Sequence, residues 1–424
     1  MRHLAVRRRA GVGLIITIAL MTALAACGAN AKSSSGSGES KGPITIGLIG
    51  PLSGPVAQTT VDARRGAQVA MNQINAAGGV RGGRKLVLKV ANEPTDPAGS
   101  VTAMRNFASA GVPIVMGDML TPDCDASAPV AQSLGILDIS AGCAGGNLTG
   151  PNREFKTFFS AAGSDSAQAY ALGHVLPARY PKVKNLYVVG YDYLPGHQTA
   201  SYIESTWQAK NPALKVKKSY FVPLTQLNFS SIVSTIGASA TAAPSTQGLL
   251  LTTYGSGTLA LLQELQQSGL INRFSFIAST FMYYQPAVAL KGKAPKVVDS
   301  YSYVYWGAFH NPVNNKFVAA YQKIAPGLYP SDWSYQAYVA VLGAAKALDK
   351  VKTINLNNLS NALENTTING PTGTFKVGGA DSHQFLFPTV VGELGGDPSS
   401  PDGVKAYSID TIPGALSNSI AFKE

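Results

Sequence analysis

Two neighbouring segments carry residue types that could bind a small polar ligand. Thr121 offers a hydroxyl at the start of an expected helix, and residues 142–146 form a Gly-rich turn with free backbone N–H groups. Each follows a short apolar run of strand type, 113–117 and 136–140. If these strands are parallel neighbours, hydroxyl, N–H groups and helix N-terminus meet at one sheet edge, where open α/β sheets bind ligands. Two ordinary strand-to-helix turns explain the stretch equally well on its own.

Catalytic and metal-binding patterns are weak by comparison. The histidines are far apart, and none forms a metal-ligand pair or adjoins a cysteine: His3, His174, His197, His310 and His383. No Walker loop and no G-x-G-x-x-G are present, and the G-x-S-x-G string at 38–42 lies in low-complexity sequence without a preceding strand. We expect no enzyme activity, no metal and no cofactor. A Ser–His–Asp set assembled in space stays open as the alternative.

Composition and charge describe an exported globular protein. The 424 residues are 45% hydrophobic and 13% charged, which predicts two or three domain-sized units with ample core. Four arginines precede Cys27 without an acidic residue, so the rest of the chain carries +7 of the formal +11. No basic helix or Lys/Arg run remains, and we expect no nucleic-acid partner.

The N-terminus has the features of a targeting segment. A basic stretch, 7–9, precedes an apolar stretch, 12–24, which is shorter than the roughly 20 residues of a membrane span. The following Leu-Ala-Ala-Cys resembles the lipobox of bacterial lipoproteins, which implies that Cys27 is acylated and anchors the protein to the outer face of the cytoplasmic membrane. We expect a signal peptide over 1–26 and a flexible Ser/Gly tether over 27–43. An uncleaved membrane helix is the alternative.

The two remaining cysteines lie in the two ligand-facing turns. Cys124 follows Thr121 closely, and Cys143 lies in the Gly-rich turn. Outside the cytoplasm, a leftover pair favours a disulfide over two free thiols, so we predict a Cys124–Cys143 bridge that holds these turns together.

Strand and helix patterns alternate on either side of this region. The capping side chains expected at helix starts are Asp62, Asp96, Thr121 and Asp165, and Pro122 suits a first helical position. This alternation predicts an α/β fold of two doubly wound parallel-sheet lobes: 44–161 with 301–383, and 162–300 with 384–424. Three crossings, near 155–160, 301–306 and 372–377, would form the hinge. The tail beyond Leu394 is turn-rich and predicts no element.

Several strings in the chain point to one family. ITIGLIGPLSGPVAQ, GAQVAMNQINAAGGVRGG, TDPAGSVTAMRNFASAGVPIVMG and PVAQSLGILDIS resemble the type I periplasmic binding proteins, in the leucine/isoleucine/valine-binding branch. The resemblance runs from Ile44 to about Leu394. It implies a substrate-binding protein that closes on a small ligand and presents it to an ABC permease.

The resemblance also implies a set of ligand contacts from both lobes. A hydroxyl for the ligand carboxylate and a contact turn would come from the first lobe, and two strand-end aromatics from the second: Thr121, Gly142, Cys143, Ala144, Tyr193 and Tyr254. For each tyrosine, a half-buried aromatic at a strand end is the structural alternative.

Three departures from the family pattern affect the expected ligand. Ala144 lacks the hydroxyl that usually ends the turn, and Thr59 stands where an aromatic often covers the ligand. Thr280 stands where an acidic residue often pairs the α-ammonium, whose burial without a carboxylate costs several kcal/mol. Either Asp118 or Asp192 substitutes for that carboxylate, or the ligand lacks an ammonium.

The acidic residues Asp123 and Asp125, in the first turn of the Thr121 helix, weaken its attraction for a carboxylate. The expected function is nonetheless an exported solute-binding lipoprotein of an ABC importer, with an amino acid or small amide-like compound as ligand. A ligand-sensing receptor component and an extracytoplasmic hydrolase are the alternatives.

Overall fold

The structure is a computed structural model that describes residues 42–54, 56–145, 148–150, 155–280, 283–301, 303 and 309–414. The expected signal peptide, nearly all of the tether and the lipidation candidate Cys27 lie outside the described residues. Within the described part of the chain, no helix combines the length and the apolar character needed to cross a bilayer.

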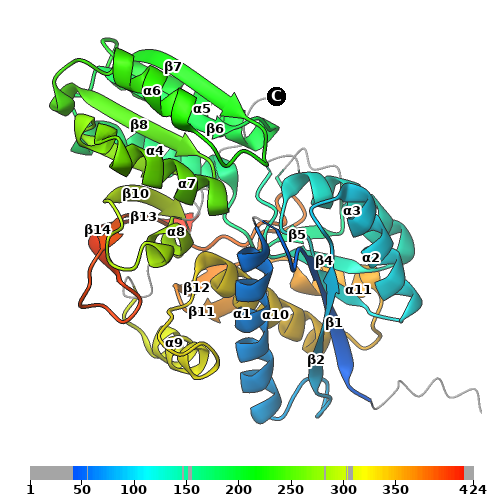
Figure 1. Cartoon of the computed structure of the whole chain (residues 1–424). Coiled ribbons are helices and arrows are strands. Elements are labelled where there is room, and N and C mark those ends of the chain that lie inside the picture. The colour runs from blue at the N-terminus through cyan, green and yellow to red at the C-terminus, as the bar shows by residue number, and fades with distance from the viewer. Residues whose placement is uncertain are drawn as a thin grey trace, which may run out of the picture. The chain divides into compact units, whose positions relative to one another are not determined.

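Five parallel strands form the first sheet, in the order β2-β1-β3-β4-β5 (Figure 1). Their bounds are β1 Ile44–Gly50, β2 Leu86–Asn92, β3 Ile114–Met116, β4 Leu137–Ser140 and β5 Phe158–Ser160. One face packs against α1 (Ala57–Ala76) and α10 (Asp332–Lys350), and the other against α2 (Pro97–Ser109) and α3 (Thr121–Leu134). Because both faces are covered, β1 is a nearly continuous apolar run.

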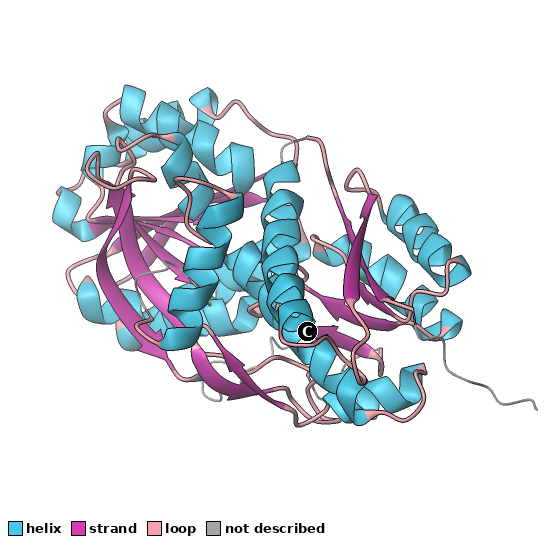
Figure 2. Cartoon of the chain, turned by 90° about the horizontal axis from the view of Figure 1, so that it is seen from below, coloured by secondary structure: helices cyan, strands magenta, loops and turns pink. Residues whose placement is uncertain are grey.

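Seven strands form the second sheet, in the order β14-β13-β10-β9-β8-β6-β7. Helices lie along the sheets (Figure 2). The parallel strands are β6 Asn185–Tyr191, β7 Lys215–Val222, β8 Gln247–Thr252, β9 Phe276–Ser279 and β10 Val297–Tyr301. The helices on one face are α4 (Asp165–Arg179) and α5 (Leu194–Lys210); those on the other are α6 (Ser230–Ser239), α7 (Gly255–Gln267) and α8 (Tyr284–Ala289). The predicted α/β class with two parallel-sheet lobes is confirmed.

The C-terminal strands differ from the expectation. β13 (Thr389–Gly396) and β14 (Val404–Ile412) run antiparallel and extend the second sheet at one edge. The tail gave no strand signal because β14 is largely exposed, as edge strands often are. The stretch expected as the last crossing is instead β12 (Gly373–Lys376), which pairs with β11 (Thr367–Gly370), and the chain passes to β13 after this hairpin.

Two of the crossing segments are hydrogen-bonded to each other. The Ser160 N–H donates to the His383 carbonyl at 3.1 Å, and the Phe385 N–H donates to the Ser160 carbonyl at 2.9 Å. Gln384 Nε2 also donates to the Ser160 carbonyl, at 3.2 Å. These bonds tie the first and last crossings together. The exact residue boundaries of the two lobes stay a prediction.

Helix α1 begins earlier than expected and packs closely on α10. It starts at Ala57 after Val56, so Asp62 does not cap it but lies in its interior, 4% exposed. At Gly66, a Cβ would lie 1.8 Å from the Ser334 carbonyl oxygen of α10. Only glycine permits this approach, so α1 and α10 are in backbone contact where they cross.

Replacing Gly66 therefore tests this close approach. Gly66→Ala should lower the free energy of unfolding by about 1–3 kcal/mol, because the methyl group forces the two helices apart. Gly237→Ala in α6, where the nearest atom to the new Cβ is 3.9 Å away, should instead raise it by up to about 1 kcal/mol. Urea denaturation of both variants measures the two shifts. Equal effects of the two substitutions would contradict the account.

Candidate ligand-binding site

A small cavity lies where the C-terminal ends of strands from both sheets meet, and we call it the first chamber. Its volume is about 50 Å³. The first lobe contributes Thr59 of α1 and residues that follow β3 and β4. The second sheet contributes residues that follow β6 and β8 and the last residue of β10, and α4 and α10 contribute their first turns. The lining residues are Thr59, Met119, Leu120, Thr121, Gly142, Ala144, Asp165, Tyr193, Tyr254, Tyr301 and Trp333.

Thr121 is the first residue of α3 and faces this chamber, but it does not cap the helix as expected. The residue that precedes the helix is Leu120, whose extended backbone (φ −123°, ψ 142°) lets the helix start one residue before Pro122. The Thr121 hydroxyl makes no hydrogen bond to a described residue. This hydroxyl is therefore available to a ligand at the N-terminus of α3, where an anionic group is favoured.

The turn after β4 presents less backbone than the sequence suggested. The N–H groups of Gly142 and Cys143 both donate to Ser140 Oγ, at 3.2 and 2.9 Å, so they are not free for a ligand. Gly142 and Ala144 line the chamber, whereas Cys143 does not. At Gly142, a Cβ would lie 2.6 Å from both Met119 Cα and Trp333 Cζ3, so the turn fits its place only with glycine.

A disulfide joins α3 to this turn. The Sγ atoms of Cys124 and Cys143 are 2.12 Å apart, and both residues are fully buried. The Asp118 N–H donates to the sulfur of Cys124 at 3.2 Å. The bridge therefore ties together the two segments that carry Thr121 and Ala144.

Two tyrosines form the wall on the side of the second sheet. Tyr193 follows β6 and directly precedes α5, and Tyr254 follows β8 and directly precedes α7. Their rings pack edge to face with centroids 6.0 Å apart, and Tyr191 packs in the same way on Tyr254 at 5.0 Å. Burial raises the pKa of Tyr193 and of Tyr254, so both phenols are neutral donors at physiological pH.

Asp165 also lines the chamber, a placement that the sequence did not indicate. The helix cap is Ser164, whose Oγ accepts from the Ala167 N–H, and Asp165 is the first residue of α4. Asp165 is 2% exposed, and its Oδ1 has no hydrogen-bond partner among the described residues. Burial raises the pKa of this carboxyl to about 7. No lysine or arginine is found among the described residues that line the chamber.

The acidic residues expected to pair a ligand ammonium lie elsewhere. Asp118 is fully buried and accepts from Ser127 Oγ at 2.7 Å, while Asp192 is exposed, with its Oδ1 2.8 Å from His197 Nε2. Neither lines the chamber, and neither does the buried Thr280. Sequence reasoning missed Asp165 because an acidic residue at a helix start reads as a cap or a favourable partner of the helix dipole.

The acidic residue Asp123 has less effect on α3 than expected. Burial, together with the nearby carboxyl of Glu93, raises the pKa of Asp123 to about 8. At neutral pH this side chain is therefore mostly uncharged, and it opposes an anionic group at the helix N-terminus only weakly.

This fold, with its chamber between two α/β lobes, defines a solute-binding protein. The family model for periplasmic binding proteins matches residues 43–397. The chain belongs to this family, whose members bind small molecules outside the cytoplasm and serve ABC transporters. The predicted resemblance and the predicted role as a substrate-binding protein are confirmed.

Individual relatives carry different ligands. The chain is 26% identical over 332 residues to a leucine-, isoleucine-, valine-, threonine-, and alanine-binding protein of Pseudomonas aeruginosa, covering 78% of this chain and 84% of that protein. A solute-binding protein from Rhodopseudomonas palustris HaA2 in complex with p-hydroxybenzoic acid is similar in structure (TM-score 0.76, 18% identity, 90% of this chain and 100% of that chain). A branched-chain amino acid transporter substrate-binding protein from Streptococcus pneumoniae in complex with isoleucine is also similar in structure (TM-score 0.73, 17% identity, 88% of this chain and 99% of that chain).

The raised pKa of Asp165 predicts a pH-dependent cost of its burial. The pKa of Asp165 is about 7 in the folded protein and near 3.8 when the side chain is exposed. Unfolding therefore releases a proton at any pH between these two values. As the pH rises from 4 to 8, the protein should therefore lose up to about 4 kcal/mol of stability relative to the Asp165→Asn variant. Urea denaturation of both proteins at pH 4, 6 and 8 measures the difference. A difference that is constant over this range would show that Asp165 titrates normally.

Proposed function

We propose that this protein binds an amino acid, or a closely related small amine, in the first chamber and delivers it to an ABC permease. The observation that carries this proposal is the buried Asp165 carboxyl: among the described residues, its Oδ1 has no hydrogen-bond partner and no lysine or arginine lines the chamber that it faces. A ligand ammonium supplies the missing partner. Pairing and hydrogen bonding then offset the cost of burying both charges.

The rest of the chamber suits the other groups of an amino acid. The Thr121 hydroxyl at the N-terminus of α3 binds the ligand carboxylate, and Gly142 and Ala144 leave room beside it. Tyr193 and Tyr254 close over the ligand from the opposite side. The carboxylate and the ammonium are thus held by different segments, which fixes the orientation of the ligand.

The relatives bind two classes of ligand, and the charge of the chamber favours one of them. The Pseudomonas aeruginosa relative is named for five amino acids, while the Rhodopseudomonas palustris neighbour holds p-hydroxybenzoic acid. A benzoate carries a negative charge and no ammonium, so it offers no cationic partner to an ionised Asp165. An amino acid satisfies both Asp165 and Thr121, and we infer that class for this chain.

Closure of the two lobes on the ligand follows because each lobe supplies part of the ligand contacts. The chamber takes Thr121 from the first lobe and Tyr193 and Tyr254 from the second, so all of these contacts form together only when the lobes are closed. A ligand that binds the closed form better shifts the equilibrium toward it. The closed form is then the one presented to the permease. We keep the predicted lobe boundaries, 44–161 with 301–383 and 162–300 with 384–424, as part of this proposal.

Substitutions in the chamber test the assignment of its residues. Thr121→Ala and Tyr193→Ala should each weaken the binding of the best amino acid about tenfold or more. Thr121→Ala removes a hydrogen bond to a charged group, which contributes about 1.5–3 kcal/mol, and Tyr193→Ala removes the ring that buries the ligand from the second lobe. Isothermal titration calorimetry after a thermal-shift screen of amino acids, amides, urea-like compounds and short organic acids measures this.

Matched controls lie far from the chamber on exposed surfaces. Thr102→Ala on α2 and Tyr407→Ala on β14 change the same residue types outside the chamber lining. They should leave the affinity unchanged. If Thr121→Ala and Tyr193→Ala bind the best ligand as tightly as the controls do, the site lies elsewhere.

The proposal includes a lipid anchor at Cys27. The Leu-Ala-Ala-Cys string and the basic and apolar stretches before it support cleavage and acylation at this residue. A Ser/Gly tether of the length expected here, 27–43, would have a root-mean-square reach of roughly 20–25 Å, enough to separate the binding domain from the bilayer surface.

Removing the acylated thiol tests this anchor. In a bacterial host, the wild-type chain should be recovered in the membrane fraction with the mass of a lipid-modified Cys27, and Cys27→Ser should lack that modification. Intact-mass spectrometry of both proteins measures it. Recovery of a mature wild-type chain without lipid would contradict the anchor and leave the ligand proposal untouched.

A further inference from the structure

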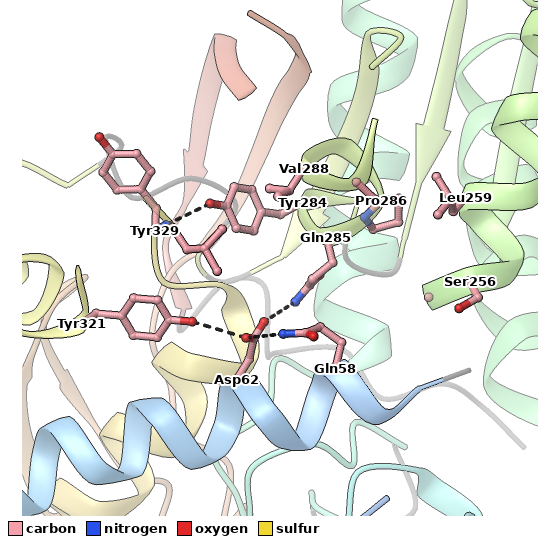
Figure 3. A pocket seen from close by; sticks show the side chains of 13 residues that line it. Gln58, Asp62, Ser256, Leu259, Tyr284, Gln285, Pro286, Val288, Tyr321 and Tyr329 are labelled. Atoms are coloured by element: carbon pink, nitrogen blue, oxygen red, sulfur yellow. Dashed lines mark hydrogen bonds between the residues drawn. The ribbon is translucent and has the colours of Figure 1, made fainter. Parts of the chain in front are cut away.

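A larger cavity lies between α1, α7, α8 and α9 (Pro312–Ile324), and we call it the second chamber (Figure 3). Its volume is about 310 Å³, in the range of small-molecule sites. Its wall is mostly apolar, with Leu259 from α7, Pro286 and Val288 from α8, and Leu328. The relatives' ligands and the family match assign nothing to it.

The two chambers adjoin at two places on opposite lobes. On α1, Thr59 lines the first chamber and its neighbour Gln58 lines the second. At the start of α7, Tyr254 lines the first and its neighbour Gly255 the second. Successive Cα atoms are only about 3.8 Å apart, so each of these two segments borders both chambers.

A buried carboxylate orients the polar groups of the second chamber. Gln58 Nε2 donates to Asp62 Oδ1 at 2.9 Å, and Gln285 Nε2 donates to Asp62 Oδ2 at 3.0 Å (Figure 3). Tyr321 and Ser331 also donate to Asp62, at 3.3 and 2.8 Å. The acceptor sites of Asp62 are thus occupied by protein donors, and its role is to hold the glutamine side chains.

This arrangement leaves polar amide atoms for a ligand. Each amide nitrogen donates one of its two N–H groups to Asp62, so each glutamine keeps its second N–H and a carbonyl oxygen, Gln58 Oε1 or Gln285 Oε1, that accepts no hydrogen bond from a described residue. The glutamines come from opposite sides, α1 of the first lobe and α8 against the second sheet. The chamber therefore combines an apolar wall with two oriented amide groups.

The geometry points to a single ligand whose side chain occupies the second chamber. The first chamber, at about 50 Å³, has room for the ammonium and carboxylate end of an amino acid and little more. We propose that the substrate is an amino acid with a long, mainly apolar side chain that carries a hydrogen-bonding group near its end. This inference rests on the proposed function, which supplies the head group in the first chamber.

A series of straight-chain amino acids tests the inference on the full chain. The probes are alanine, norvaline, norleucine and 2-aminoheptanoic acid, and their dissociation constants come from isothermal titration calorimetry. Affinity should rise about fourfold with each methylene, because each added group is buried against the apolar wall. Affinities that do not depend on chain length would overturn the inference.

Filling the chamber should remove this gain selectively. Leu259→Trp should weaken norleucine at least about tenfold and leave alanine within about twofold, because only the longer side chain reaches the filled space. Val288→Phe fills the chamber from α8 and provides a second variant if the first does not fold. Leu134→Trp, at an exposed leucine at the end of α3, is the matched control.

The two amide groups, of Gln58 and Gln285, are tested with a pair of ligands of equal size. 6-Hydroxynorleucine should bind about three- to tenfold more tightly than 2-aminoheptanoic acid, and Gln58→Met should abolish this preference. An equal loss for alanine and norleucine in both filling variants would overturn the inference while the proposed function stands. Failure of every amino acid to bind, or unchanged affinities in Thr121→Ala and Tyr193→Ala, would overturn the proposed function and this inference with it.

Discussion

The burial of the Asp165 carboxyl is the constraint on which the binding account depends. A carboxyl group withdrawn from water needs a partner or a proton, and at Oδ1 this one has no partner among the described residues. Its pKa of about 7 lies near physiological pH, so a ligand ammonium can displace the proton at small cost. Burial that destabilises the empty protein thereby becomes a source of selectivity for a cationic group.

A disulfide and hydrogen bonds hold the first-lobe segments of the first chamber in place. The disulfide between Cys124 and Cys143 joins the N-terminal turn of α3 to the turn after β4, and Ser140 Oγ accepts two N–H groups of that turn. Gly142 packs against Met119 and Trp333 without room for a side chain. These contacts fix the position of the Thr121 hydroxyl relative to Ala144, so the ordering cost is met during folding and not during binding.

The sequence predicted the architecture well because its signals are local. Strand–helix alternation and family strings identified both lobes, and Thr121, Ala144, Tyr193 and Tyr254 all line one chamber. Asp165 was missed because its placement depends on how α4 meets the turn after β4, where the Asp165 N–H donates to the Ala144 carbonyl at 3.0 Å. Asp62 was expected to cap a helix but lies inside α1. There it binds Gln285 and Ser331, partners more than 200 residues away in sequence that local patterns do not reveal.

The coupling between Asp165 and a ligand ammonium can be measured directly by proton release. Calorimetric titration of the best-binding amino acid at pH 6, in two buffers with different ionisation enthalpies, gives the number of protons exchanged on binding. With a pKa of about 7, Asp165 is mostly protonated at this pH, so binding should release close to one proton in the wild type and about none in Asp165→Asn. Binding by the wild type without proton release would contradict the account.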